Sequence, residues 1–311
     1  MNAFLGIDTS NYTTSTALYD TERRVMVQQK RLLPVKSGQK GLRQADAVYL
    51  HLKQLPELLE ALFVQEDASV AAVGVSVRPR DVDGSYMPCF EAGYCTARAI
   101  AAALRVPVFT FSHQAGHIAA ALFSADKLDW LERPFVAFHL SGGTTEAVLC
   151  QPADGTPKVE LLFSSLDLKA GQAVDRVGLL LGLPFPAGPA LEALSHESNR
   201  SFSIRPSMKG GDCSLSGIEN RCAAMQMRGE PDADVARYCI CAIAAALDGM
   251  TCAVRTRYPD LPLLYAGGVM SNSDIRTAFT ERYGAVFARP GFSSDNAAGI
   301  TILAMRKAGQ S

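Results

Sequence analysis

The sequence has little excess charge: 30 Lys and Arg side chains against 31 Asp and Glu give a formal net charge of −1 over 311 residues. This balance excludes the overall positive field of chains that hold nucleic acid alone, so any RNA contact must come from a local patch or a partner subunit. No CxxC pair occurs among the eight cysteines, which lie mostly in apolar segments. We interpret them as reduced, buried thiols of a cytosolic protein rather than disulfides or a zinc cluster.

The sequence also lacks a recognisable targeting segment. Met1 leads directly into an expected strand, without the basic and apolar regions of a signal peptide. We expect no apolar run long enough to cross a membrane. Hydrophobic residues make up 48% of the chain, enough for one large or two medium domains with full cores. These features predict a cytoplasmic globular protein without membrane contact.

Two segments of the chain resemble each other. Residues 8–14 (DTSNYTT) lie within an apolar, β-prone frame, and residues 139–145 (HLSGGTT) lie within another. In both, a hydrophobic strand runs into small and hydroxyl residues and then into a second strand, which is typical of a β-hairpin. Such a turn exposes backbone N–H groups that suit phosphate, so the repetition predicts a duplicated domain closing over one nucleotide. The alternative is two unrelated hairpins in an α/β protein.

Apolar periodicity predicts further helices and strands along the chain. Expected helices cover residues 45–65, 91–105, 113–123, 172–181, 189–195, 233–258 and 296–307, and expected strands cover 70–77, 106–111 and 263–266. Ser112 is the expected N-cap of the third helix. Turn signals over 124–134 indicate a domain boundary. We predict an N-terminal lobe of residues 1–133, with 297–311 packing back on it, and a C-terminal lobe of residues 134–296.

His113 and His117 lie four residues apart at the start of an expected helix. This spacing puts both imidazoles on one face, within reach of one ion, and the helix dipole disfavours their protonation. Because no glutamate follows the first histidine, zinc-peptidase chemistry is disfavoured. A third ligand must come from elsewhere, and Asp295, just before the last expected helix, is the best candidate. Its alternative role is that of a helix N-cap.

Two further loops have residues that suit a nucleotide. Gly267 and Gly268 follow a strand, where backbone can approach a phosphate or sugar closely, and Asn272 is placed to contact an adenine edge. A Gly-Gly pair after a strand is also a common turn between strand and helix. Glu192 follows the rigid loop 183–189, where its carboxylate suits ribose hydroxyls or a solvated helix start.

Eight collinear motifs make the chain similar to the TsaD family, the threonylcarbamoyl-transferase subunits of tRNA modification. These motifs are Gly6–Ser10, Ser112–His117, Leu140–Gly143, Gly171–Arg176, Leu183–Pro189, Ser214–Gly217, Gly267–Val269 with Asn272, and Ser294–Ala298. The resemblance spans nearly the whole chain. It implies an α/β fold of the actin and sugar-kinase type, with two duplicated α/β lobes around a nucleotide cleft.

The resemblance also implies a set of site residues. Iron or zinc would be bound by His113, His117 and Asp295. His139 sits where some relatives carry a tyrosine near the metal, so it is a further ligand or, alternatively, an inward strand residue that donates to a backbone carbonyl. An adenine nucleotide, ATP or threonylcarbamoyl-AMP, would contact Ser141, Gly142, Gly143, Gly188, Glu192, Gly267, Gly268 and Asn272. The catalytic candidates are Thr9, Ser10 and Asp175.

The sequence departs from the family pattern at several positions. Family members usually have Cys-Asp-Glu where this chain has Asn11, Tyr12 and Thr13, so an acidic pair is lost. Other replacements are Thr144, Leu168, Gln172 and Arg176. Three hypotheses follow: a metal-dependent threonylcarbamoyl transferase acting on tRNA, a divergent paralogue with another acceptor, and a non-catalytic nucleotide-binding partner subunit. The expected partners are TsaB-like and TsaE-like proteins. tRNA would be reached through them or through the basic loop of Arg31, Lys36, Lys40 and Arg43, which otherwise is simply solvated.

Overall fold

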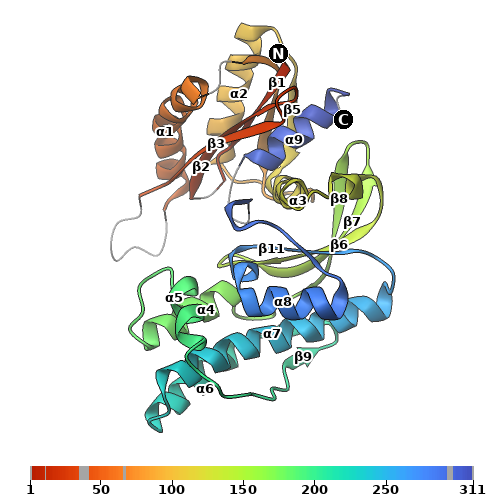
Figure 1. Cartoon of the computed structure of the whole chain (residues 1–311). Helices are drawn as coiled ribbons and strands as arrows, with labels where there is room; N and C mark the ends of the chain where they lie inside the picture. Colours follow the sequence, from red (N-terminus) through yellow and green to blue (C-terminus); the bar gives the residue numbers. More distant parts are fainter. Residues whose placement is uncertain (1, 11, 35–41, 66–67, 293–296, 310–311) are drawn as a thin grey trace. The chain divides into compact units, whose positions relative to one another are not determined.

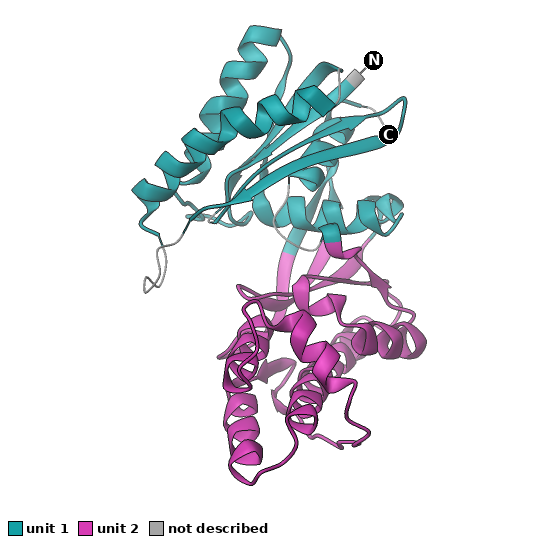
Figure 2. Cartoon of the chain, turned by 60° about the vertical axis from the view of Figure 1, so that its left-hand side comes forward, with its two compact units in different colours: residues 1–133, 151–159, 291–311 teal, residues 134–150, 160–290 magenta. Residues whose placement is uncertain are grey.

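The computed structural model describes residues 2–10, 12–34, 42–65, 68–292 and 297–309. The chain forms two compact units, shown in two colours in Figure 2. Unit 1 consists of residues 1–133, 151–159 and 291–311, and unit 2 of residues 134–150 and 160–290. Each unit has its own five-stranded sheet and its own hydrophobic core.

Unit 1 is built around the first sheet (Figure 1). Its strands are β1 (Asn2–Asp8), β2 (Thr13–Asp20), β3 (Val25–Leu32), β4 (Ser69–Arg78) and β5 (Val108–Ser112). Its helices are α1 (Gln44–Gln65), α2 (Phe90–Leu104), α3 (His113–Ser124), α9 (Ala298–Lys307) and the 3-10 helices η1 (Leu128–Glu132) and η3 (Pro290–Phe292). The strand order is β3-β2-β1-β4-β5, with β1 antiparallel to β2 and parallel to β4.

Helices cover both faces of this sheet (Figure 1). Successive strand residues point to opposite faces, so Leu5 and Ile7 of β1 join the core beneath α1 and α2, whereas Phe4 packs on the side of α9. Helix α9 approaches α3 closely at Gly299. A Cβ there would collide with the carbonyl oxygen of Gly116 of α3, so this contact requires glycine. The C-terminal helix is therefore held beside the helix that carries the histidine pair.

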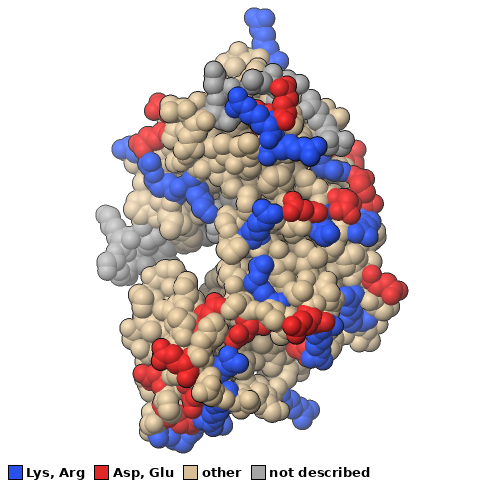
Figure 3. All heavy atoms as spheres, in the orientation of Figure 1, with Lys and Arg blue, Asp and Glu red and all other residues tan. Residues whose placement is uncertain are grey.

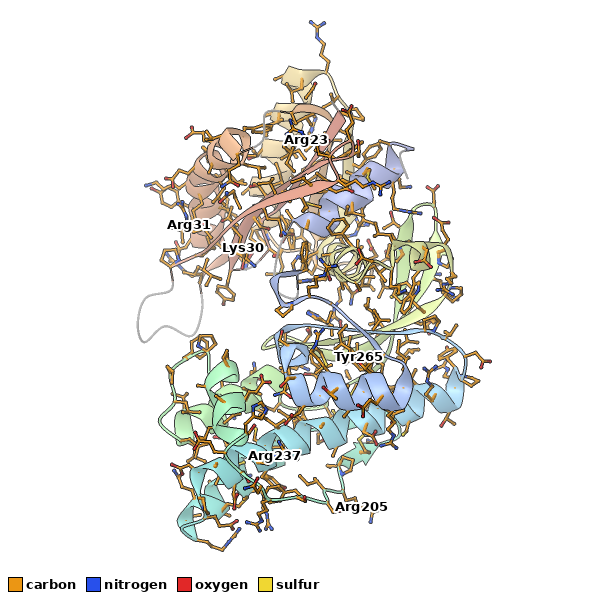
Figure 4. The ribbon with its side chains drawn as sticks, viewed as in Figure 1. Arg23, Lys30, Arg31, Arg205, Arg237 and Tyr265 are labelled. Atoms are coloured by element: carbon orange, nitrogen blue, oxygen red, sulfur yellow. The ribbon has the colours of Figure 1, made fainter. Side chains whose placement is uncertain are left out.

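Unit 2 contains the second sheet and most of the remaining helices. Its strands are β6 (Phe135–Leu140), β7 (Thr145–Ala153), β8 (Thr156–Ser164), β11 (Leu263–Ala266) and β12 (Val286–Phe287), and β9 (Ser207–Lys209) pairs with β10 (Asp212–Ser214). Its helices are α4 (Ala170–Leu180), α5 (Gly188–Ser195), α6 (Ser216–Met227), α7 (Asp232–Arg257), α8 (Ser273–Tyr283) and the 3-10 helix η2 (Gly268–Ser271). Tyr265 of β11, labelled in Figure 4, is fully buried and stacks on Phe138.

The two sheets have the same topology. The order β8-β7-β6-β11-β12 repeats the order β3-β2-β1-β4-β5, with an antiparallel pair followed by parallel neighbours in each. The hairpins expected around residues 8–14 and 139–145 are the β1–β2 and β6–β7 pairs. The predicted duplicated α/β architecture is confirmed.

One sequence expectation needs correction. We expected no apolar run long enough to cross a membrane, but α7 has 26 residues and contains an 18-residue window of mean hydropathy 1.4. Half of this window is buried inside the protein. Val235, Cys239, Ile243 and Met250 of α7 belong to the core of unit 2, which accounts for its apolar character. Helix α7 is therefore apolar because it is the central helix of the core of unit 2.

Charged side chains of both signs alternate on the face drawn in Figure 3. Arg31 forms an ion pair with Glu57, and Arg43 forms one with Asp46, with Nε and Oδ2 2.8 Å apart. Figure 4 shows Arg31 beside Lys30 on β3. Lys36 and Lys40 of the basic loop lie outside the described residues. The two described arginines of this loop are thus already paired with carboxylates.

Candidate functional site

A buried carboxylate lies where β1 ends in unit 1. Asp8 has no solvent-exposed surface. Its Oδ2 accepts a hydrogen bond from the Ser10 hydroxyl at 2.8 Å, and its Oδ1 accepts one from the Ser76 hydroxyl of β4. Gly6 and Asp8 alternate with the core residue Ile7, so Asp8 faces α3 and α9 rather than α1.

Asp8 also orients the first histidine of the pair. Nδ1 of His113 lies 3.1 Å from Oδ1 of Asp8. An ionised carboxylate only accepts hydrogen bonds, so the proton of a neutral His113 resides on Nδ1 and Nε2 keeps its lone pair. His117 lies one turn further along α3, and its ring centroid is 4.3 Å from that of His113. The sequence spacing therefore brings the two imidazoles together as predicted.

The third predicted ligand cannot be placed. Asp295 lies outside the described residues. Among residues that are described, no three His, Cys, Asp or Glu side chains form a group suited to a metal ion.

The helix that carries the histidine pair begins at the predicted residue. Ser112 is its N-cap, because the Ser112 hydroxyl accepts the backbone N–H of Ala115 at 3.1 Å.

The two catalytic candidates of the first hairpin have different surroundings. The Thr9 hydroxyl donates to the carbonyl of Cys89 at 3.0 Å and accepts the N–H of Gly93 at 3.1 Å, which fixes the start of α2 against β1. Ser10 instead belongs to the Asp8 network. Ser10 is thus connected to His113 through one carboxylate, whereas the contacts of Thr9 are with α2.

A buried histidine, His51 of α1, lies on the opposite face of the same sheet. Thr14 donates its single hydroxyl hydrogen to Oε1 of Gln54 at 2.7 Å, so Nδ1 of His51, also 2.7 Å away, donates to Thr14. Nε2 of His51 has no hydrogen-bond partner among the described residues. Burial lowers the pKa of His51 to about 4, against a smaller opposing effect of the Asp8 carboxylate. This imidazole is therefore neutral near pH 7.

In unit 2, the predicted phosphate turn is closed by its own serine. Ser141 Oγ accepts the N–H groups of Gly143 and Thr144, at 3.2 and 3.1 Å. The carbonyl of Ser141 accepts the N–H of Gly171 at 3.0 Å, which joins the turn to the start of α4. The N–H of Gly143, which the sequence predicts to hold phosphate, thus already has an acceptor within the turn.

The remaining nucleotide candidates gather where β6 and β11, which are parallel, end. Gly267 has φ of 101°, and a Cβ there would collide with Leu140 at the end of β6, so this position requires glycine. Asn272 N-caps α8, with its Oδ1 accepting the N–H of Ile275 at 3.1 Å. Parallel strand ends of α/β sheets are common ligand sites.

Glu192 links this region to α5. Its Oε1 accepts the N–H and the hydroxyl of Ser273, at 2.7 and 2.5 Å. Glu192 and Asn272 are thus brought to adjacent positions at the start of α8, and Gly188 begins the helix that carries Glu192. Asp175 accepts the N–H of Ala187 at 2.9 Å, a contact that fixes the loop before α5.

Sequence reasoning missed Asp8 and Ser76 as site residues. Asp8 belongs to the repeated hairpin segment and to the motif Gly6–Ser10 but was given no role of its own, and Ser76 lies in a strand expected to be simply buried. The available signal was weak: a carboxylate at the end of an apolar strand, followed by two hydroxyl residues. Because Asp8 and His113 are 105 residues apart, only the fold brings them together.

Comparison with known proteins gives a family match. The family model described as TsaD, tRNA N6-adenosine threonylcarbamoyltransferase, matches residues 36–302. The tRNA N6-adenosine threonylcarbamoyltransferase of Thermus thermophilus is 31% identical over 314 residues, covering 97% of this chain and 92% of the relative. That of Brucella anthropi is 31% identical over 286 residues, covering 84% of this chain and 76% of the relative.

The fold of this chain resembles those of several solved structures. Component A of the Acidaminococcus fermentans (R)-2-hydroxyglutaryl-CoA dehydratase has a TM-score of 0.58, with 17% identity and full coverage of both chains. A ROK family glucokinase from Streptomyces griseus has a TM-score of 0.51, with 13% identity, covering 98% of this chain and 99% of that one. At these identities the similarity concerns the fold alone, which is of the actin and sugar-kinase type.

Proposed function

The chain belongs to the tRNA N6-adenosine threonylcarbamoyltransferase family, and we propose that it transfers a threonylcarbamoyl group from an adenylate to the N6 amine of a tRNA adenine. The transfer breaks the bond between the carbamoyl carbon and the phosphate oxygen. It forms a carbon–nitrogen bond to the amine, releases AMP and removes one proton from the amine. The observation that carries this proposal is the His113–His117 pair, oriented by buried Asp8, within a chain of this family.

For the metal ion we propose His113, His117 and Asp295 as ligands, with iron or zinc as the ion. The described donors fit such an ion, since neutral imidazoles with a carboxylate partner are common ligands of both metals. Bound there, the ion would polarise the carbamoyl carbonyl as a Lewis acid. Asp295 as the third ligand and His139 as an additional ligand stay predictions.

For the adenylate we propose the strand ends of unit 2. The amide of Asn272 has its oxygen engaged as a helix cap, which leaves its NH₂ group available for an adenine acceptor atom. Glu192, at the same edge, is a carboxylate suited to ribose hydroxyls. Gly188 and Gly268 have no atom within 4 Å of a Cβ position, so nothing in the described chain blocks close approach of a ligand there.

A second candidate function is favoured by one specific observation. The acidic pair of the family is replaced by Tyr12 and Thr13, and Thr13 is a buried residue of β2. The proton of the acceptor amine then lacks the carboxylates that relatives offer at these positions. This favours a paralogue with another acceptor amine or hydroxyl, or a non-catalytic partner subunit that binds nucleotide.

Transfer itself is the test. The protein is incubated with threonylcarbamoyl-AMP, unmodified tRNA and the TsaB-like and TsaE-like proteins of its host, and the modified nucleoside is measured by mass spectrometry. We expect a measurable rate below that of an ordinary family member, abolished in His113→Ala. Absence of product with every tRNA would contradict the proposal, and nucleotide binding without product would favour the partner subunit.

A further inference from the structure

A hollow of about 390 Å³ lies between α2 and β5 in unit 1. Val106, Val108 and Thr110 form one side of it. These alternate residues point to one face of the sheet, and the two valines pack on the core that α2 covers. Strand β5 is the last in the order β3-β2-β1-β4-β5, so no further strand of the described chain pairs with its outer edge. The hollow, here called the α2–β5 groove, therefore lies at the outer edge of the sheet.

The other side of the α2–β5 groove is a stripe along α2. Tyr94, Arg98 and Arg105 line it, and their spacings of four and seven residues put them on one face of the helix. The guanidinium carbon of Arg98 lies 5.7 Å from the ring centroid of Tyr94, a cation–π contact that orients the arginine. The two arginines are about 10 Å apart along the helix axis. The residues that line the groove include no acidic side chain.

Both arginines of the groove are exposed, and neither forms an ion pair with a carboxylate of the described chain. Other arginines of unit 1 differ in this respect. Arg31, Arg78 and Arg133 each form an ion pair with a carboxylate. A guanidinium group has five N–H donors and no acceptor. The donors of Arg98 and Arg105 are therefore available to an anion.

The arrangement suits a chain of phosphate groups. Guanidinium groups bind phosphate through paired hydrogen bonds. A small-molecule site encloses most of its ligand, whereas this groove is open at the edge of the sheet and its charges are exposed. Two arginines about 10 Å apart along a helix can contact separate phosphates of one strand. An extended polyanion thus uses both charges.

The charge distribution of the chain favours RNA as this polyanion. The net charge of −1 gives no overall attraction for RNA, so contact requires a local patch. The described arginines of the basic loop, Arg31 and Arg43, are paired with carboxylates. We propose that the α2–β5 groove binds the phosphate backbone of tRNA through Arg98 and Arg105. This inference rests on the proposed function, in which tRNA is the acceptor.

The salt dependence of tRNA binding tests the groove. The logarithm of the binding constant falls with the logarithm of the salt concentration, by about 0.7 to 0.9 for each phosphate contact. Unmodified tRNA is titrated with the full chain, alone and with its TsaB-like protein, at several salt concentrations. We expect Arg98→Ala and Arg105→Gly each to reduce this slope by about 0.7 to 0.9, and the double variant by about twice as much. Arg98→Lys keeps the charge and should keep the slope.

Arg24→Gly is the matched control for Arg105→Gly. Both arginines are exposed, both have φ of 57°, and neither has a carboxylate partner in the described chain. Because glycine adopts positive φ without strain, neither variant should lower the midpoint of thermal unfolding. We expect the wild-type slope in Arg24→Gly. Equal slope losses in the two variants would show a general effect of charge and would overturn the proposal.

Transfer kinetics distinguish a failure of the groove from a failure of the proposed function. We expect the double variant Arg98→Ala, Arg105→Gly to raise KM for tRNA about 10-fold, the usual size of a lost charged hydrogen bond, with kcat unchanged. Wild-type slope and KM in this variant, with transfer intact, would overturn the groove and leave the proposed function standing. Reduced slopes without any transfer by the wild type would contradict only the proposed function.

Two other results would also overturn the proposal. One is a wild type that binds no tRNA, either alone or with the TsaB-like protein. The other is unchanged tRNA binding with weaker binding of the TsaB-like protein in Arg98→Ala and Arg105→Gly, which would identify the α2–β5 groove as a protein interface. Calorimetry with the TsaB-like protein in the absence of RNA measures this second effect.

Discussion

Nδ1 of His113 and Oδ1 of Asp8 lie 3.1 Å apart although 105 residues separate them in the sequence. Ser10, just after β1, and Ser76 of β4 donate to the same carboxylate, so its position is fixed from two sides. A carboxylate held in this way determines both the tautomer and the ring orientation of the histidine. Asp8 is therefore a positioning residue for the ion that we propose on α3.

We predict that Asp8→Asn weakens metal binding without removing the site. The variant loses the negative charge, and its amide presents an N–H to Nδ1, which moves the ring proton of His113 to Nε2. Outer carboxylate partners of metal-binding histidines typically contribute 10- to 100-fold to affinity, so we expect a loss of about this size. The measurement is competition with a chromophoric chelator.

Asp20→Asn is the matched control for Asp8→Asn. Asp20 is equally buried in unit 1, and it accepts the N–H groups of Glu22 and Arg23 rather than a histidine. The metal affinity of the Asp20→Asn variant should equal that of the wild type. If the affinity of Asp8→Asn also stays at the wild-type value, Asp8 does not position His113.

We further predict about one transition-metal ion per chain, lost in His113→Ala, His117→Ala and Asp295→Ala. Each variant removes one of three ligands, and two remaining ligands hold such an ion weakly. Elemental analysis after dialysis is the measurement, with His196→Ala as control because His196 contacts Asp274 on the surface of unit 2. Wild-type metal content in all three variants would show that the ion is absent from this site.

The pH dependence of stability should reveal His51. The unfolded chain binds a proton on His51 below about pH 6.5, but the folded chain does so only below about pH 4. The unfolded state therefore binds more protons in this window, so folding stability is full above pH 6.5 and falls as the pH drops toward 4. The shift corresponds to about 3 kcal/mol.

Urea unfolding at several pH values measures this slope, with the single tryptophan, Trp130, reporting on unit 1. His51→Asn is the matched variant, because an amide near the place of Nδ1 still bonds to Thr14 but does not titrate. We expect a smaller decrease of stability between pH 6.5 and 4.5 in this variant. Identical slopes in both proteins would show that His51 titrates normally.

Much of the fold follows from local patterns in the sequence. The strand Leu263–Ala266 and the Ser112 cap coincide with their predictions, because apolar runs and capping side chains act over a few residues. Helix α8 was not predicted, since it buries only Ile275 and Phe279 and lacks a clear apolar face. The hydrogen bonds of the candidate site could not be predicted in this way, because they join residues that are far apart in the sequence. The contacts of Glu192 with Ser273 span 81 residues and have no local signature.

Nucleotide recognition by Asn272 is testable without damaging the helix that it caps. Asn272→Asp keeps an oxygen to accept the N–H of Ile275, and a carboxylate is favourable at a helix N-terminus. It replaces the NH₂ donor by a second carboxylate oxygen and adds one negative charge. We expect AMP binding to weaken by about 1–3 kcal/mol, the cost of leaving a buried polar group without its partner. The midpoint of thermal unfolding should not fall.

Calorimetry with AMP and GMP measures this effect. Because guanine presents a donor where adenine N1 accepts, the wild type should prefer AMP, and Asn272→Asp should lose that preference. Glu192→Ala should also weaken AMP binding by about 1–3 kcal/mol, through lost ribose contacts, without changing the preference for adenine. Equal wild-type affinity for AMP and GMP would contradict the role of Asn272.

The replaced acidic pair leads to the prediction on transfer rate. Tyr12 is partly exposed, whereas Thr13 is a buried residue of β2, so a carboxylate costs less desolvation at position 12 than at position 13. We expect Tyr12→Asp to raise a weak rate of threonylcarbamoyl transfer to tRNA, because a base near the acceptor amine contributes about 10²–10⁴-fold in enzymes. Tyr12→Asn is the uncharged control, and the modified nucleoside is measured by mass spectrometry. A wild-type rate equal to that of an ordinary family member would show that the lost acidic pair is not needed. Equal rates for Tyr12→Asp and Tyr12→Asn would show that the charge at position 12 has no part in the transfer.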